Sequence, residues 1–280
     1  MRQINVDTIR QAVKEMVMEA NTRLPGDLQA ALVSAKEKES SSRGRQILEI
    51  CLENAALAAS EGMALCQDTG LVVIDLEIGQ ALQLLGGDLE KAVNQGVREG
   101  YLAGSLRKSM VSDPLHRVNT GDNTPAVIHI HIVPGENLKI TVLPKGAGSE
   151  NMGQMAMLKP AQGVEGVKEF VFRVVREAGG NPCPPIIVGV GIGGNMEKVA
   201  LLAKQALMRE IGQVHPDARL ADLEAELLTA INQMNIGPQG LGGDTTALAV
   251  HIETYPTHIA CLPVAVCIGC HSTRRLSRIL

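Results

Sequence analysis

Apolar residues recur at helical spacing through most of the first 60 positions of the chain. Positions three and four apart share one face of a helix, so this spacing predicts helices within residues 5–60. Asp7 is expected to cap the first helix, and Pro25-Gly26 is expected to interrupt the run. The two apolar stripes are Val6, Ile9, Val13, Met16 and Met18, followed by Ile47, Leu48, Cys51, Leu52, Ala55 and Leu57.

Three apolar runs before residue 145 predict strands. Residues 71–78 form a continuous run, typical of a buried strand, whereas residues 126–133 alternate strictly between apolar and polar. A third run, 138–143, follows after Pro134-Gly135-Glu136-Asn137. The last two runs are therefore expected to form an antiparallel hairpin. His129 and His131 would share one strand face, which is more typical of a solvent-facing row than of a metal site.

The second half of the chain mixes helical and extended patterns. This order predicts an α/β fold with a mixed sheet flanked by helices, in a single two-lobed domain spanning residues 1–280. No internal repeat or low-complexity linker divides it. The helices are expected at about 88–101, 164–176, 195–210 and 218–234, and the strands at about 185–190, 246–252 and 259–268.

Composition excludes several classes of protein. Of 280 residues, 45% are hydrophobic and only two are Phe, two Tyr and none Trp, so the core is aliphatic and base-stacking platforms are not expected. A formal net charge of −4 lacks the basic excess of a nucleic-acid-binding protein. No apolar run reaches the ~20 residues that cross a bilayer, and the first residues lack a secretory pattern. A cytoplasmic protein with reduced thiols is therefore expected.

A glycine-rich segment, Gly189-Val-Gly-Ile-Gly-Gly194, has the spacing of a dinucleotide-binding loop. That interpretation also requires a second strand ending in an acidic residue about 20 positions later. The sequence after Glu210 does not read as such a strand. Close packing of backbone at a strand-to-helix turn, which glycine permits, explains the segment better.

Three of the six cysteines stand in polar or proline-rich surroundings far apart in the sequence: Cys66 in Cys-Gln-Asp-Thr-Gly, Cys183 among prolines, and Cys270 in Cys-His-Ser-Thr-Arg-Arg. Thiolates from separate loops suit a soft metal centre. Plain turns with buried thiols remain an alternative for the first two. Cys267-x-x-Cys270 also has the spacing of half a zinc site or of a redox pair, but no second close pair of ligands accompanies it. Cys51, on an apolar helical stripe, is expected to be an inert buried thiol.

Two further segments carry groups that bind anions. Arg107 offers the planar fork that matches a carboxylate. Lys145-Gly-Ala-Gly-Ser-Glu-Asn151 is a glycine-rich loop whose backbone N–H groups could hold an anionic oxygen. Taken alone, an exposed arginine is usually just solvated, and a plain tight turn is as consistent with the glycine-rich segment as an anion site.

Taken together, these segments resemble the α subunit of the two-subunit class I, iron–sulfur-dependent fumarate hydratases, in the fumarate/tartrate dehydratase family. The resemblance covers nearly the whole chain. Its motifs are Cys66-Gln-Asp-Thr-Gly70, Asn119-Thr-Gly121, Lys145-Gly-x-Gly148, Cys183-Pro-Pro185, Gly240-Leu-Gly-Gly243 and Cys270 with Arg274.

The resemblance implies a [4Fe–4S] cluster with three protein ligands, so that the fourth iron can act as a Lewis acid. By position these ligands are Cys66, Cys183 and Cys270, which leaves Cys51, Cys261 and Cys267 structural. The substrate-contacting residues implied are Gln67, Asp68, Arg107, Gly146 and His258, of which Asp68 and His258 also take part in catalysis.

The activity implied is the reversible hydration of fumarate to (S)-malate. L-Tartrate dehydratase is the alternative within the family, and a metal-binding scaffold subunit is the alternative outside catalysis. Single-chain members of the family continue well past the third cysteine into a second domain. Because this chain has ten residues after Cys270, a separate β subunit is expected to complete the active site, in an α2β2 heterotetramer.

Overall fold

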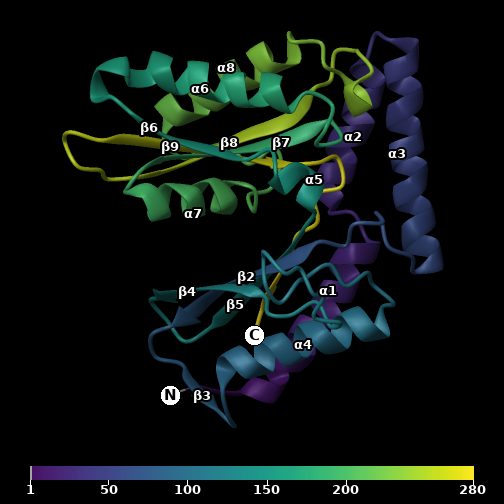
Figure 1. The fold of residues 1–280 in the computed structure, drawn as a ribbon, viewed down its shortest axis with the longest axis vertical. Coiled ribbons are helices and arrows are strands. Elements are labelled where there is room, and N and C mark those ends of the chain that lie inside the picture. Colours follow the sequence, from purple (N-terminus) through teal and green to yellow (C-terminus); the bar gives the residue numbers. More distant parts are fainter. Residues whose placement is uncertain (1) are drawn as a thin grey trace. The chain divides into compact units, whose positions relative to one another are not determined.

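The computed structural model describes residues 2–280 and has the expected mixed α/β class (Figure 1). The chain divides into two compact units. Unit 1 combines the described part of Met1–Pro25 with Ala55–Ala147 and Arg274–Leu280. Unit 2 combines Gly26–Asn54 with Gly148–Thr273. Each unit is therefore assembled from segments distant in the sequence. That residues 1–280 act as one domain remains a prediction.

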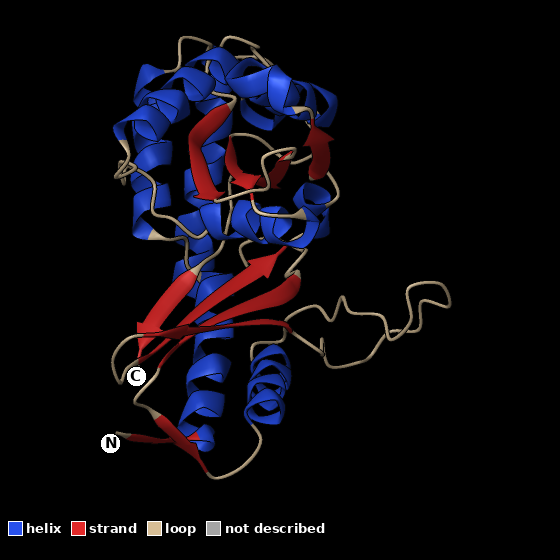
Figure 2. Ribbon diagram, turned by 90° about the vertical axis from the view of Figure 1, so that its left-hand side faces the viewer, coloured by secondary structure: helices blue, strands red, loops and turns tan. Residues whose placement is uncertain are grey.

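Unit 1 is built on a four-stranded sheet with the order β10-β5-β2-β4. Its apolar face packs against the helices α1 and α4, which lie below the sheet in Figure 2. Asn5, rather than the expected Asp7, caps α1 by accepting a hydrogen bond from the Asp7 N–H. The elements are β1 (Gln3–Asn5), α1 (Val6–Thr22), β2 (Leu71–Gly79), β3 (Gln83–Leu85), α4 (Leu89–Ala103), β4 (Val127–Val133), β5 (Leu138–Lys145) and β10 (Leu276–Ile279).

The predicted hairpin between the second and third strands is wrong. Both β4 and β5 pair with β2 instead of with each other: β4 runs parallel to β2, and β5 runs antiparallel to it. The buried strand β2 forms backbone hydrogen bonds along both of its edges, so it lies between β4 and β5. The connecting turn crosses the end of β2, where the Gly79 N–H donates to the Asn137 carbonyl and the Ala81 N–H donates to the Gly135 carbonyl.

Unit 2 is built on a second four-stranded sheet, with the order β6-β9-β7-β8. Helices α6 and α8 cover one face of this sheet and α7 covers the other (Figure 1). The elements are α2 (Gly26–Lys38), the first part of α3 (Ser42–Glu61), α5 (Ala147–Glu150), β6 (Gln154–Leu158), α6 (Gly163–Ala178), β7 (Ile186–Gly193), α7 (Met196–Ala206), α8 (Ala218–Asn232), β8 (Ala247–Tyr255) and β9 (Leu262–Gly269).

The glycine-rich segment 189–194 lies mostly inside β7 and not in a loop after it. A Cβ on Gly189 would lie 2.3 Å from the Ala203 carbonyl oxygen, and one on Gly191 would lie 2.2 Å from that of Val199. The strand therefore packs directly on the backbone of α7. The close-packing interpretation is confirmed, although the glycines act along the strand as well as at the turn.

Among residues 2–280, no helix combines the length and apolar character needed to cross a membrane.

Candidate functional site

The loop Cys66–Gly70 joins α3 to β2 in unit 1 and lies against the end of β5. Gly70 has a φ of +73°, and a Cβ there would lie 2.5 Å from the Lys145 carbonyl group. Only glycine fits this close approach. Gly70 therefore brings the Cys-Gln-Asp segment beside the Lys145-Gly146 segment.

The Asp68 side chain is fixed by two backbone donors. Its Oδ1 accepts from the Gly70 N–H at 3.0 Å, and its Oδ2 accepts from the Ala147 N–H at 2.7 Å. A Cβ on Gly146 would lie only 3.2 Å from the same Oδ2. The structure thus brings together Asp68 and Gly146, two of the residues that the resemblance implies as substrate contacts; that role stays a prediction. The direction of the carboxylate is set by the two loops jointly.

Two buried side chains that no sequence motif marked donate hydrogen bonds to the loop Cys66–Gly70. The Tyr101 hydroxyl donates to the Thr69 carbonyl at 2.6 Å and to the Gly70 carbonyl at 3.1 Å. Asn123 donates to the same Gly70 carbonyl at 3.0 Å. Burial raises the pKa of Tyr101 to about 12, so the phenol remains a donor at neutral pH. Tyr101 lies on an apolar helical stripe, and that pattern indicates only a core residue.

Arg107 is held through its backbone and exposes its side chain. Its carbonyl accepts from the Thr69 hydroxyl at 2.8 Å. The residues that follow are fixed by Asn123, whose Oδ1 accepts from the Ser109 N–H at 2.7 Å, and by Asn119, which donates to the Lys108 carbonyl. The Asn-Thr-Gly motif therefore orders the segment that presents the guanidinium of Arg107.

Arg274 is the largest fully buried side chain of the described residues, with 2% exposure. Its Nη1 donates to Asn21 at 3.0 Å, and its Nη2 lies 3.5 Å from the position that a Cβ on Gly146 would take. Its Nε is buried and has no hydrogen-bond partner in the structure. A cation is thus placed next to the loop that orients Asp68, whereas from the sequence Arg274 was known only as part of the motif with Cys270.

In unit 2, Cys183 and the segment after Cys270 are joined by hydrogen bonds. The Cys183 carbonyl accepts from the His271 N–H at 3.2 Å and lies 3.0 Å from the ring Nδ1 of His271. Cys183 has a φ of +53°, a strained conformation for a residue with a side chain. Such strain is more common at functional sites than elsewhere.

Cys51 lies close enough to these two cysteines to interact with them electrostatically. Burial first, and then the neighbouring Cys183 and Cys270, together raise the pKa of its thiol to about 11. Cys51 is therefore a protonated thiol at neutral pH, which agrees with the expected inert role. The sequence did not predict its position beside the two proposed ligands.

The Gly240–Gly243 motif packs against the loop that carries Cys183. A Cβ on Gly240 would lie 2.6 Å from the Gly180 Cα, so the two backbones touch. The far end of the motif is held by the buried Glu39, whose carboxylate accepts from the N–H groups of Asp244 and Thr245 at 2.9 to 3.0 Å. The motif thus supports the position of Cys183.

His258 lies exposed between β8 and β9. Its Nδ1 accepts from the Ala260 N–H at 3.1 Å, in its own turn. This bond does not join His258 to another predicted site residue. Gln67 is also exposed, and its Oε1 lies 3.3 Å from the Cys66 thiol.

The three predicted ligands are thiols, the donor type that iron–sulfur clusters take, so their chemistry fits such a cluster. All six cysteines are in the thiol form. Within residues 2–280, no group of three His, Cys, Asp or Glu side chains is arranged to hold one metal ion. A cluster binds each thiolate through a different iron, so its ligands need not converge on one point. The predicted ligands fall in both units, with Cys66 in unit 1 and Cys183 and Cys270 in unit 2.

Comparison with known proteins gives consistent matches over nearly the whole chain. The family model described as "Fumarate hydratase (Fumerase)" matches residues 10–278. The putative L(+)-tartrate dehydratase subunit alpha of Methanocaldococcus jannaschii is 42% identical over 275 residues, which cover 95% of each chain. The L(+)-tartrate dehydratase subunit alpha of Escherichia coli O157:H7 is 35% identical over 278 residues, which cover 98% of this chain and 91% of that one.

Proposed function

The chain belongs to the fumarate hydratase family and is a hydro-lyase, and on this basis we propose that it catalyses the reversible addition of water to fumarate to give (S)-malate. The observation that carries the proposal is the fixed carboxylate of Asp68, held by the N–H groups of Gly70 and Ala147 beside Gly146. A rigid carboxylate next to backbone N–H groups can assist proton transfer at a bound dicarboxylate.

The remaining residues of the proposed site bind and orient the substrate. The exposed guanidinium of Arg107 would bind one carboxylate of the substrate through its planar fork. Gln67 and Gly146 would contact the substrate from the two loops that meet at Gly70. His258 would contribute a hydrogen bond to it. Asp68 would assist removal of the C3 proton, with the principal base on this chain or on its partner.

We propose Cys66, Cys183 and Cys270 as the ligands of a [4Fe–4S] cluster. When bound, the cluster would supply a Lewis-acidic iron for the hydroxyl that leaves. Anaerobically prepared Cys183→Ser and Cys270→Ser proteins should each lose most iron and sulfide, whereas Cys267→Ser should keep both. Cluster loss in Cys267→Ser would overturn the choice of Cys270.

L-Tartrate is the second candidate substrate, because both relatives described above are named L(+)-tartrate dehydratase α subunits. Steady-state rates with fumarate, (S)-malate and L-tartrate distinguish the two. A kcat/KM for L-tartrate that exceeds the value for (S)-malate would replace the first proposal by the second.

The names of the relatives also support a β subunit that completes the active site. We propose that the chain works as part of an α2β2 assembly. The chain prepared alone should hold the cluster but show little turnover, and addition of the β subunit should restore it. Full turnover by the chain alone would refute this requirement.

Arg107→Lys tests the substrate-binding residue, with Arg117→Lys as a matched control because Arg117 lies exposed in the same segment. Arg107→Lys should raise KM at least about tenfold, since a lysine cannot replace the two-point contact with a carboxylate. Arg117→Lys should leave KM unchanged. An unchanged KM in Arg107→Lys would remove Arg107 from the proposed site.

A further inference from the structure

The free edge of the sheet in unit 1 carries an unusual sequence. Strand β4 is an edge strand in the order β10-β5-β2-β4, with β2 on one side and no strand on the other among residues 2–280. Soluble proteins usually protect such edges with charges, prolines or bulges. The opposite edge, β10, follows this rule, because it is short and its Arg278 pairs with Glu15 at 2.7 Å. From Val127 to Val133, β4 has no Lys, Arg, Asp, Glu or Pro.

The isoleucines of β4 are unevenly covered by their own unit. Ile128, Ile130 and Ile132 alternate with histidines and so share the face that carries the apolar core. The start of the strand is tied to α4, since the Ala126 N–H donates to Asn94 at 2.8 Å, and Ile128 packs on the core. Ile130 and Ile132, further along, are 52% and 67% exposed. The apolar row therefore continues beyond the cover of α4.

The sequence of β4 is a palindrome, Val-Ile-His-Ile-His-Ile-Val, centred on Ile130. We propose that this edge pairs with the same edge of a second copy of the chain, antiparallel and about a two-fold axis at Ile130. In that register Ile130 faces its own copy, and each Ile132 faces the second copy's Ile128. A two-fold contact needs this self-complementarity, in which residue i meets j and j meets i.

This pairing covers the side chains that unit 1 leaves exposed. The axis lies perpendicular to the sheet, so both isoleucine rows stay on the same face. The end of β4 that α4 covers in one copy is placed beside the exposed end of β4 in the other. Each copy thus supplies packed apolar surface where the other lacks it. The two sheets join into one continuous sheet across the axis.

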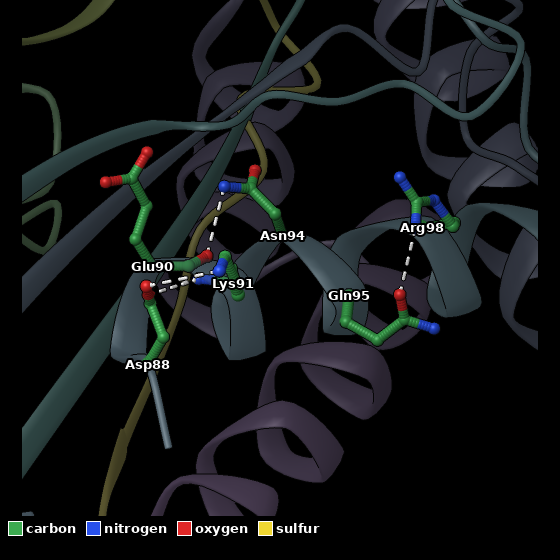
Figure 3. A pocket seen from close by; sticks show the side chains of 6 residues that line it. All are labelled: Asp88, Glu90, Lys91, Asn94, Gln95 and Arg98. Atoms are coloured by element: carbon green, nitrogen blue, oxygen red, sulfur yellow. Dashed lines mark hydrogen bonds and ion pairs between the residues drawn. The ribbon is translucent and has the colours of Figure 1, made fainter.

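The outer face of α4, on the same side of the sheet, carries charges of both signs. Asp88, Glu90 and Lys91 lie at one end, and Arg98 at the other, of the residues around a hollow of about 440 Å³ (Figure 3). A face with mixed charges can approach its own copy without a net like-charge repulsion. A partner recognised by charge alone would require a surface of one sign. The palindrome and the mixed charges both favour a second copy as the occupant.

A disulfide tests the register directly. Cα atoms of directly opposed residues in an antiparallel pair lie about 4.5–5.5 Å apart, within the range that a disulfide spans. Ile130→Cys should therefore form a covalent dimer when diamide removes the two thiol hydrogens. Ile132→Cys is the matched control, because its symmetry mates would be about 13 Å apart. The wild type measures cross-linking by the native thiols.

The full chain is used, together with any subunit that co-purifies with it. A covalent dimer from Ile130→Cys, with neither Ile132→Cys nor the wild type giving one, is the expected result. Equal cross-linking of both variants, or of neither, would overturn the proposed register. Absence of cross-linking would also be the outcome if a different subunit covered β4.

A charge placed on the edge gives an independent measurement. Ile130→Lys should raise the dissociation constant of the dimer at least about tenfold in sedimentation experiments, because it buries a lysine opposite its copy. Ile259→Lys is the control, since Ile259 is 92% exposed in unit 2. A monomeric wild type, or a dimer that Ile130→Lys leaves unchanged, would overturn the proposal. Circular dichroism checks that each variant is folded. The test does not depend on the reaction catalysed.

Discussion

At the scale of residues, the proposed site depends on groups that never touch a substrate. Asp68 is aimed by two backbone N–H groups, and the loop that carries it is held by Tyr101 and Asn123. Arg274 adds a buried cation whose Nε lacks a hydrogen-bond partner. Burying such a donor without an acceptor costs free energy of folding. Changes to these supporting residues should therefore affect the site and the stability of unit 1 together.

Tyr101→Phe should lower the stability of unit 1 by about 1–3 kcal/mol, because the buried Thr69 carbonyl loses its donor. Turnover should fall as well, since the loop that carries Asp68 loosens. Tyr255→Phe is the matched control, because Tyr255 is 54% exposed and surface changes seldom exceed about 0.5 kcal/mol. Urea unfolding and steady-state kinetics give both readouts. Equal stabilities for the two variants would contradict the supporting role of Tyr101.

Cys51 should make the apo-protein less stable in alkali. Its pKa is raised in the folded state from 9.0 to about 11. Below about pH 9 the thiol is protonated whether the chain is folded or not. Between pH 9 and 11 only the unfolded chain releases the proton, so stability falls as pH rises. Unfolding by urea at pH 8 and pH 10.5 should show a smaller alkaline loss in Cys51→Ala. An identical loss in both proteins would contradict the raised pKa.

At the scale of elements, helical periodicity predicted α1, α4, α6, α7 and α8, and the continuous apolar run 71–78 predicted the strand β2, within a few residues of their ends. It could not predict the partners of the strands. The short turn after β4 favoured a hairpin by local geometry, but β2 lies between the two strands because its long buried run pairs on both edges. Pairing over long sequence distances depends on tertiary packing, which local patterns do not record.

For the proposed site too, the sequence marked some of the residues that lie together and missed others. The resemblance grouped Asp68 with Gly146 and Cys183 with Cys270, and the structure shows hydrogen bonds between the loops of each pair, whereas the roles of these residues stay predictions. The motifs gave no sign of Tyr101 or of the electrostatic effect of Cys183 and Cys270 on Cys51. A buried aromatic or thiol on a helical stripe looks the same in sequence whether it fills the core or supports a site.

Gly189→Ala should destabilise unit 2 by about 1–3 kcal/mol. Its Cβ would lie 2.3 Å from a carbonyl oxygen of α7, and overpacking against backbone cannot be relieved by a change of rotamer. Gly26→Ala is the control, because nothing lies within 4 Å of the added Cβ at the start of α2. The control should keep or slightly raise stability. Thermal unfolding of both variants measures the difference, and similar melting temperatures would contradict the close packing.

At the scale of the whole molecule, each of the two units is completed by a segment that is distant in the sequence from the rest of that unit. The short C-terminal segment Arg274–Leu280 belongs to unit 1, whereas the residues just before it belong to unit 2. Strand β10 pairs with β5, and Leu276 and Leu280 pack on the core of unit 1. The few residues after Thr273 therefore complete a sheet that begins at residue 71.

A chain that ends after Arg275 should lose at least about 3 kcal/mol of stability in unit 1, because two packed leucines and an edge strand are removed. Hydrogen exchange should show the loss first in β5, with unit 2 protected as before. Arg278→Ala is the control, since removing its half-exposed ion pair with Glu15 costs less than about 1 kcal/mol. Unchanged exchange in β5 would contradict the role of β10.

Because β10 follows unit 2 in the sequence, the sheet of unit 1 can be completed only after the residues of unit 2 have been synthesised. A ribosome adds about 5–20 residues per second, so the segment Gly148–Thr273 takes roughly ten seconds to make. During that interval β2, β4 and β5 already exist, but the strand that covers the far edge of β5 does not. The nascent chain therefore carries an incomplete sheet with two open edges while unit 2 is being synthesised. Completion of unit 1 therefore waits until Arg274–Leu280 has been made, and slow translation near residue 270 should prolong dependence on chaperones.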